Sequence, residues 1–162
     1  MVTKRRFREE GHRRKFLAVV DGTPESSRAV HYAARRAGAI GNGLELVCVV
    51  APGDFGHWLG VEEIMRADAR AAAEEQLEAA VALARSCCEV AVTTSIREGE
   101  RAAEVVKLIE EDRDIAIMVL AAGDGKDGPG PLVSSVTQRA AFPIPVTIVP
   151  HALSDEEIDD LV

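Results

Sequence analysis

The sequence is poor in aromatic residues, in cysteine and in long apolar runs. Phe, Trp and Tyr make up only 4% of its 162 residues, so we expect the core to be built from Val, Ile, Leu and Ala. No apolar run approaches the roughly 18 residues that a membrane span requires, and the basic N-terminal stretch lacks the apolar segment of a secretory signal. These absences predict a cytoplasmic protein with one globular domain.

The three cysteines and four histidines lack the spacing of a disulfide scaffold or a metal site. Cys48 stands alone and Cys87 adjoins Cys88, so we interpret all three as reduced thiols; the alternative is a redox role for the adjacent pair. No serine occupies the G-x-S-x-G motif of a nucleophile elbow. We therefore predict no metal site and no catalytic residue.

Charge is distributed unevenly along the chain. The net charge is −8 at pH 7, but residues 1–15 contain seven Lys or Arg and two Glu, which leaves about −13 for the remainder. An acidic body argues against nucleic-acid binding. We interpret residues 1–15 as a disordered, solvated basic tail, with electrostatic partner binding as the alternative. Residues 16–150 then form the domain, and residues 151–162 form a short acidic helix with a capping box from Ser154 to Glu157, or an acidic tail.

Short apolar runs alternate with helical patterns along the domain. The runs that we interpret as strands, because they are short and rich in Val and Ile, are 15–21, 44–52, 90–96, 115–122 and 142–150. The helical patterns are 22–41, 61–86 and 99–114, followed by a short fourth helix. Thr23 and Pro24 have the residue types that begin a helix. Strands joined through helices predict a doubly wound α/β fold, a parallel sheet covered on both faces.

Two segments stand where doubly wound sheets bind ligands, outside the carboxyl ends of the strands. Asp21 follows the first strand, and a carboxylate there is costly to bury without a partner or ligand; the alternative is that it caps the loop or the first helix together with Thr23. The glycine-rich stretch AAGDGKDGPGPLVSSV, residues 121–136, follows the fourth strand. We therefore expect a candidate site between these two loops.

A third loop, after the second strand, contains aromatic side chains. Phe55, His57 and Trp58 lie there, and an aromatic lid over a flat ligand needs such residues. The alternative is that they pack over the loop or against a partner subunit.

The succession of KFLAVVDGTPESSRAVHYAARRA, LELVCVVAP and IAIMVLAAGDGK…SSVTQR…PIPVTIVP resembles the universal stress protein family over residues 15–150. The resemblance implies a three-layer fold with a five-stranded parallel sheet of order 3-2-1-4-5. It also implies homodimers joined through the last strand and stress-associated expression without a defined reaction. One branch of the family binds ATP and the other does not.

In the ATP-binding branch, the loop after the fourth strand has the pattern G-x2-G-x9-G-[S/T]. The resemblance assigns the ribose or adenine contact to Asp21 and the base-holding position to Val49. In the loop, Gly123 matches the first glycine, but only one residue instead of two separates it from Gly125. Eight residues instead of nine then separate Gly125 from the final pair of the pattern. The residues that then stand for the final pair are Ser134, in place of glycine, and Ser135, which keeps the hydroxyl.

The composition of this loop argues against a triphosphate cradle. Such a cradle works through converging backbone N–H groups, and Pro129 and Pro131 have none. The loop also has a net negative charge, because it contains Asp124 and Asp127 but only one positive side chain, Lys126. The loop is not a Walker A motif either, because an aspartate follows its Gly-Lys pair where Ser or Thr is required.

We therefore predict a non-enzymatic stress protein that acts by binding or through unknown protein partners, with a degenerate ATP site and no certain cofactor. The alternative is a stress sensor that binds ATP or AMP, with Mg, between the loops after strands one and four, and slow ATP hydrolysis is the one reaction left open. The candidate nucleotide-binding residues are Asp21, Val49, Gly123, Gly125, Lys126, Ser134 and Ser135, with Phe55 and Trp58 as the lid.

The last strand differs from the others because it is flanked by prolines. Pro143 and Pro145 cannot donate to a sheet ladder, which predicts an edge strand. An uncovered apolar edge is an association site. We therefore expect a homodimer formed through residues 145–149.

Overall fold

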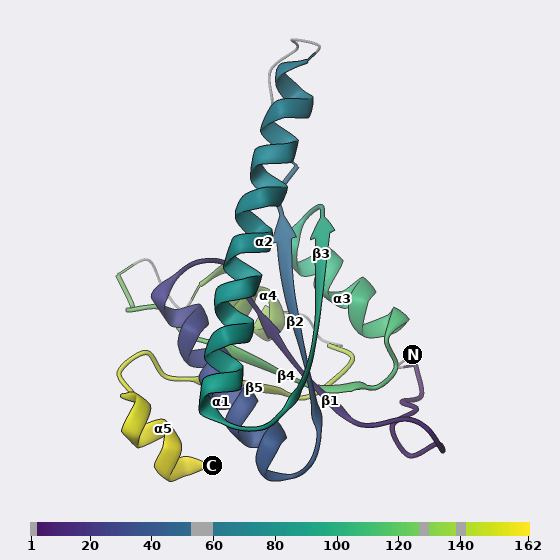
Figure 1. Cartoon of the computed structure of the whole chain (residues 1–162), viewed down its shortest axis with the longest axis vertical. Helices are drawn as coiled ribbons and strands as arrows, with labels where there is room; N and C mark the ends of the chain where they lie inside the picture. The colour runs from purple at the N-terminus through teal and green to yellow at the C-terminus, as the bar shows by residue number, and fades with distance from the viewer. Residues whose placement is uncertain (1–2, 53–59, 127–129, 139–141) are drawn as a thin grey trace.

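The computed structural model describes residues 3–52, 60–126, 130–138 and 142–162. Its centre is a five-stranded parallel sheet of order β3-β2-β1-β4-β5 (Figure 1). The strands are β1 Lys15–Val19, β2 Gly43–Val50, β3 Ala91–Glu98, β4 Ile115–Ala121 and β5 Val146–Val149. The predicted strand order and the edge position of β5 are both confirmed.

The central strand β1 explains why the strands read as nearly unbroken apolar runs. Leu17 and Ala18 point to opposite faces of the sheet, and both have 0% exposure. Ala18 pairs with Leu46 on β2 and with Val119 on β4. A parallel strand covered on both faces must be apolar at every position, not at every second one.

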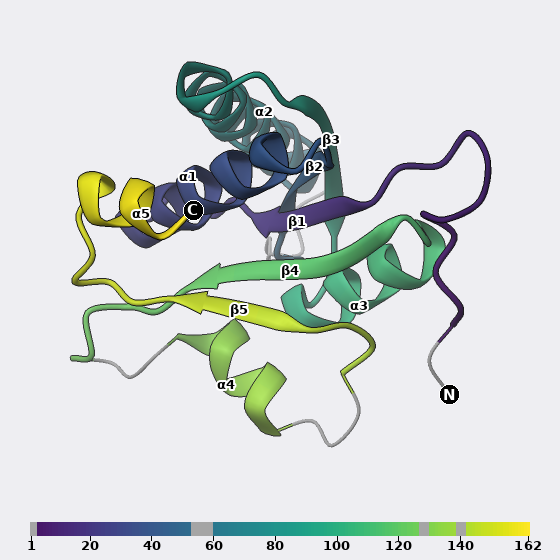
Figure 2. The same ribbon diagram turned by 90° about the horizontal axis from the view of Figure 1, so that it is seen from below.

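Helices cover the two faces of the sheet in separate layers (Figure 2). The helices are α1 Pro24–Ala39, α2 Val61–Cys87, α3 Arg101–Glu111, α4 Pro131–Gln138 and α5 Asp155–Leu161. One core lies between the sheet and α1 and α2, and the other between the sheet and α3 and α4. In the described part of the chain, no helix has the length and apolarity to cross a bilayer.

The start of α1 fixes the course of the loop after β1. The Thr23 hydroxyl accepts a hydrogen bond from the Ser26 N–H at 3.3 Å, and Pro24 occupies the first turn, as predicted. Ala29, Ala33 and their neighbours on one face are fully or almost fully buried. These small side chains bring α1 close to the sheet, so the loop is held tightly at the carboxyl end of β1.

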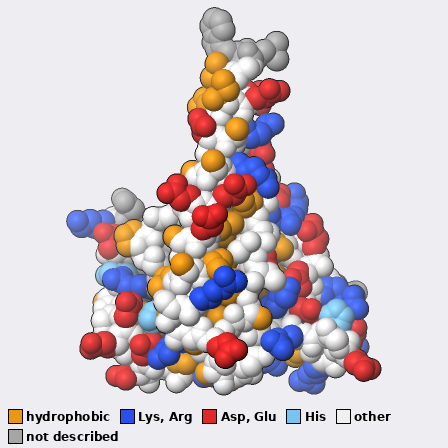
Figure 3. All heavy atoms as spheres, in the orientation of Figure 1, with side chains coloured by type: hydrophobic (Ala, Val, Ile, Leu, Met, Phe, Trp, Pro, Cys, Tyr) orange, Lys and Arg blue, Asp and Glu red, His pale blue; other side chains and the backbone are white. Residues whose placement is uncertain are grey.

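The helix α2 extends beyond the sheet. Its buried residues are Ala73, Leu77, Ala80 and Ala84, all from the middle of the helix onward, whereas residues 61–68 are all exposed. Figure 1 shows the first half of the helix projecting from the body, and Figure 3 shows hydrophobic side chains gathered near its free end. Val61, Ile64 and Met65 are the exposed large hydrophobic residues of that part.

Both terminal segments contact the domain. The helix α5 begins with the predicted capping box of Ser154 and Glu157, and Ile158 is completely buried against the α1 layer. Residues 3–14 differ from the expected solvated tail, because Arg5 donates to the carbonyl oxygens of Ile109 and Ile115. Long-range bonds of this kind leave no local sequence pattern.

Candidate functional site

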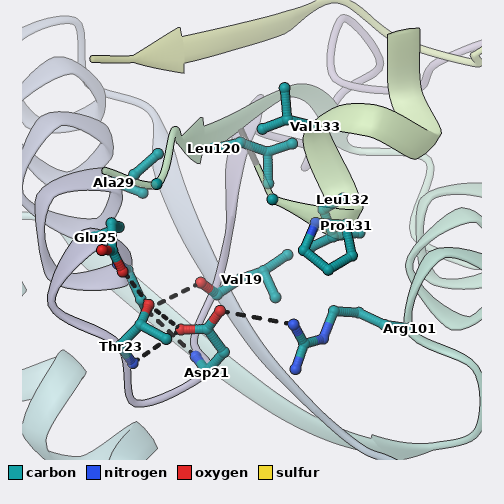
Figure 4. A pocket seen from close by; sticks show the side chains of 14 residues that line it. Val19, Asp21, Thr23, Glu25, Ala29, Arg101, Leu120, Pro131, Leu132 and Val133 are labelled. Atoms are coloured by element: carbon teal, nitrogen blue, oxygen red, sulfur yellow. Dashed lines mark hydrogen bonds and ion pairs between the residues drawn. The ribbon is translucent and has the colours of Figure 1, made fainter. Parts of the chain in front are cut away.

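The loops after β1 and β4 meet at the carboxyl edge of the sheet, where they enclose a pocket of about 140 Å³ (Figure 4). The lining residues come from the end of β1 and start of α1, from the end of β4, and from the first residues of α3 and α4. They are Val19, Asp21, Thr23, Glu25, Ser26, Ala29, Arg101, Leu120, Ala121, Gly123, Gly130, Pro131, Leu132 and Val133. The site therefore lies where the topology predicts it, at the point of strand-order reversal.

Asp21 both shapes its loop and faces the pocket. Its Oδ1 accepts hydrogen bonds from the Thr23 N–H at 3.0 Å and the Thr23 hydroxyl at 2.6 Å. The Ser26 hydroxyl accepts from the Asp21 N–H and donates to the Val19 carbonyl. The capping interpretation of Asp21 is therefore confirmed, and its other oxygen, Oδ2, remains directed toward the pocket.

Arg101 supplies the positive charge of the pocket, and the sequence analysis missed it. Its guanidinium is 3.7 Å from Asp21 Oδ2, and its side chain is 39% exposed. It is the first residue of α3, which the Glu100 side chain caps by accepting from the N–H groups of Ala102 and Ala103. The signal in the sequence was its position: it comes three residues after the end of β3, whose carboxyl end shares this edge of the sheet.

The N-terminus of α4 forms the opposite wall (Figure 4). Gly130, with φ of 102°, precedes the helix, and its carbonyl accepts the Ser134 N–H at 3.0 Å. A helix leaves its first N–H groups without intrahelical acceptors, which here are those of Leu132 and Val133. Pro131 occupies the first position, so one of the usual donors is missing there.

Among its described residues, the glycine-rich stretch 121–136 lines the pocket with Ala121, Gly123 and residues 130–133. Gly123 lines the pocket, whereas Gly125, with φ of 86°, and Lys126 are exposed and do not. The Lys126 N–H donates to Asp124 Oδ1 at 3.2 Å. A donor that a triphosphate would need is thus already used by a carboxylate of the same loop.

The remaining candidate residues lie elsewhere. Val49 is 8% exposed and packs in the core beneath α3 and α4. Ser134 and Ser135 are half-buried on α4 but do not line the pocket. The candidate lid, Phe55 and Trp58, lies outside the described residues.

A thiol close to the pocket belongs to the core. Cys48 on β2 is 5% exposed, and its Sγ donates to Gln76 Oε1 at 3.7 Å. Burial raises the pKa of this thiol; the nearby Arg101 lowers it and Asp21 raises it to a smaller extent. Cys48 is therefore held as a neutral thiol that packs beneath the site.

The arrangement fits one anionic group better than an extended ligand. Sites for small molecules usually have about 300–1,000 Å³, more than twice the 140 Å³ found here. A guanidinium and the positive end of a helix dipole face this space together. Among the described residues, no cluster of three or more His, Cys, Asp or Glu side chains has metal-binding geometry.

Comparison with known proteins identifies related sequences and folds. A model described as the Universal stress protein family matches residues 12–150, while the search of curated proteins gives no significant match. A structure of universal stress protein UspA from Lactobacillus plantarum has a TM-score of 0.71 at 17% identity, over 84% of this chain and 97% of that one.

Two further similar structures contain nucleotides. One is a universal stress protein in complex with cAMP, with a TM-score of 0.64 at 19% identity, over 85% of this chain and 97% of that one. The other is the universal stress protein from Archaeoglobus fulgidus in complex with dAMP, with a TM-score of 0.59 at 21% identity, over 83% and 96%. At these identities the likeness establishes a shared fold.

Proposed function

The chain belongs to the universal stress protein family, and from that premise we propose that it is a binding protein without turnover that takes an adenine nucleoside monophosphate. The proposed ligand places its phosphate in the pocket between the loops after β1 and β4. The proposal thus names a nucleoside monophosphate, whereas the family resemblance alone leaves ATP binding or no ATP binding open.

The observation that carries the proposal is the pairing of Arg101 with the N-terminus of α4 across a small pocket. Both features attract an anion, and the free N–H groups of Leu132 and Val133 supply directed donors. We propose that a phosphate replaces Asp21 as the partner of Arg101. Asp21 then lies close to the ribose hydroxyls, and its carboxylate accepts hydrogen bonds from them.

A triphosphate is disfavoured because the donors for its outer phosphates are missing or occupied. Pro131 has no N–H, the Ser134 N–H bonds to Gly130 within the helix, and the Lys126 N–H bonds to Asp124. Each lost neutral hydrogen bond costs about 0.5–1.5 kcal/mol, and three of them correspond to about one to three decades in affinity. The net negative charge of the loop also repels the phosphates, and this weakens triphosphate binding further.

The nucleotides in the similar structures support a monophosphate. cAMP and dAMP each carry one phosphate on an adenine nucleoside. In the proposal Mg has no required role, because a single phosphate is neutralised by Arg101 and the helix N-terminus. Phe55 and Trp58 remain the proposed lid over the base.

Turnover is not part of the proposal. Asp21 Oδ1 accepts two hydrogen bonds from Thr23, and Oδ2 faces the Arg101 guanidinium at 3.7 Å, so both carboxylate oxygens already have partners. The other ionisable side chains that line the pocket are Glu25 and Arg101. We therefore expect no release of phosphate from ATP.

We also propose that the protein is a homodimer that pairs β5 with β5 of a second copy. The carbonyls of Pro145 and Val149 bond to β4, so by the alternation of a strand the N–H and C=O groups of Val146 and Ile148 point outward. Ile148 is 39% exposed at this edge.

The three cysteines are unpaired, which supports a reducing compartment such as the cytoplasm.

The ligand proposal is tested by calorimetric titration of the wild type and of Arg101→Ala with AMP. We expect Arg101→Ala to weaken AMP binding at least tenfold, because a charge-assisted contact to phosphate is worth about 1.5–3 kcal/mol. Arg70→Ala is the matched control: its side chain is 64% exposed on α2 and pairs with Glu74, so its affinity should equal that of the wild type. Equal affinities for all three proteins would overturn the proposed site.

A further inference from the structure

Side chains from three helices meet at the C-terminal end of α2. Cys87 is the last residue of α2, His31 lies on α1 and Asp159 lies on α5. Cys87 Sγ is 3.5 Å from His31 Nδ1, and His31 Nε2 is 2.7 Å from Asp159 Oδ1. The imidazole therefore links a thiol to a carboxylate, in a cluster that shares the helix α1 with the pocket but none of the residues that line it.

The carboxylate determines which imidazole nitrogen carries the proton. An ionised carboxylate only accepts hydrogen bonds, so a neutral His31 holds its proton on Nε2 and donates it to Asp159. Nδ1 is then the acceptor for the Cys87 S–H. The hydrogen bond from His31 lowers the pKa of Asp159, and the Arg35 guanidinium, whose Nε lies 2.9 Å from the same oxygen, lowers it further. This order of groups matches that of thiol nucleophiles activated by a histidine base.

The adjacent thiol provides an internal comparison. Cys88 Sγ donates to the Ala34 carbonyl at 3.1 Å, and a carbonyl is no base. Burial raises the pKa of both thiols, so both rest protonated. Among the described residues, the imidazole contact distinguishes Cys87 from Cys88.

Solvent and small molecules have access to this cluster. Cys87 is partly exposed. An open groove of about 510 Å³ is lined by its neighbours Arg35, Cys88 and Asp159, but Cys87 itself does not line this groove. The charged and titratable groups that influence Cys87 come from every element packed there: Ser86 and Cys88 beside it, Arg35 on α1 and Asp159 on α5. A small neutral oxidant can therefore reach the sulfur without opening the fold.

We propose that Cys87 is a peroxide-reactive thiol, with His31 as its proton acceptor and Asp159 as the residue that positions His31. His31 Nδ1 takes the thiol proton, and the sulfur attacks one oxygen of a hydroperoxide. The S–O bond forms as the O–O bond breaks, and the leaving hydroxide or alkoxide takes the proton from Nδ1 and departs as water or an alcohol. Cys87 is oxidised by two electrons to a sulfenic acid, and the peroxide is reduced by two.

The test uses full-length proteins that each keep one thiol, treated with hydrogen peroxide at pH 7. Cys48→Ala with Cys88→Ser leaves Cys87, and Cys48→Ala with Cys87→Ser leaves Cys88. Mass spectrometry follows the untrapped sulfenic acid as a gain of one oxygen, about 16 Da, and a parallel sample follows the thioether that a 1,3-dione forms with it, with loss of water. We expect Cys87 to react at least tenfold faster than Cys88, since a positioned general base contributes about 10²–10⁴-fold. Equal rates would overturn the proposal.

The roles of His31 and Asp159 are tested in the protein that keeps Cys87. His31→Gln should lower the rate at pH 7 at least tenfold, and its rate should then climb steeply above pH 9, because the thiol must ionise unaided with its raised pKa. Asp159→Asn, at a partly exposed position, should change rate and pH profile in the same direction while circular dichroism stays native. If His31→Gln does not fold, Asp159→Asn decides: an unchanged rate and pH profile would refute the assignment.

Discussion

Arg101 gives the pocket between the loops after β1 and β4 its positive charge, although it stands some eighty residues from Asp21 in the sequence. Asp21 itself has two roles, since one oxygen caps the loop through Thr23 while the other faces Arg101. A single carboxylate thus sets the course of the loop and limits the charge of the pocket. The two interpretations of Asp21 that the sequence allows, capping the loop with Thr23 and facing a partner or ligand, are therefore compatible.

The pH dependence of stability should reveal the contact between His31 and Asp159. The hydrogen bond from His31 holds the pKa of Asp159 below its ordinary range, with a further contribution from Arg35. A carboxyl with a lowered pKa in the folded state stabilises the protein above its unfolded pKa of about 3.9, and this stability is lost as pH falls through the folded value. Asp159→Asn should therefore flatten the acid side of the stability curve.

Urea unfolding of the wild type and Asp159→Asn at pH 7, 5 and 3 measures this effect. Asp160→Asn, which removes an exposed carboxylate next in sequence, is the control for a change in net charge. Wild-type and Asp159→Asn curves that run parallel from pH 5 to pH 3 would contradict the account.

At the scale of elements, α5 is held by one completely buried side chain and by the polar contacts of Asp159. Ile158 has 0% exposure, whereas Leu161 on the same helix is 61% exposed. We expect Ile158→Ala to lower the free energy of unfolding by about 2–5 kcal/mol, because it opens a cavity between α5 and α1. Leu161→Ala should change it by less than about 0.5 kcal/mol, and chemical denaturation compares them. Equal losses would show that α5 does not dock as described.

The elements themselves could be predicted from sequence because their signals are local. Thr23, Pro24 and the capping box of Ser154 and Glu157 define helix starts within a few residues, and apolar runs define the strands. Contacts between distant segments had no such signal. Arg101 in the pocket, Arg5 on the end of α3, and the His31 contact to Cys87 depend on the three-dimensional arrangement of elements, which periodicity does not encode.

At the scale of the whole molecule, the two edges of the sheet differ. β3 pairs with β2 along its whole length and is eight residues long, whereas β5 has only four residues. The free groups of Val146 and Ile148 offer β5 a short antiparallel pairing with a second copy.

The proposed dimer would have a mass in solution of twice 17.3 kDa, which light scattering at tens of micromolar measures. Ile148→Lys should yield the monomer, because it places like charges opposite each other across the pairing. Ile40→Lys introduces the same charge at a position of 47% exposure after α1 and should remain dimeric. A monomeric wild type would contradict the pairing through β5.

The central claim is that the pocket accepts one phosphate and not three. Calorimetric titration of the wild-type protein with AMP and with MgATP, at the same ionic strength, tests it most directly. The account predicts that AMP binds at least tenfold more tightly than MgATP, because the loop after β4 has lost the donors of Pro131, Ser134 and Lys126 to a triphosphate. MgATP binding as tight as AMP, or tighter, would contradict it.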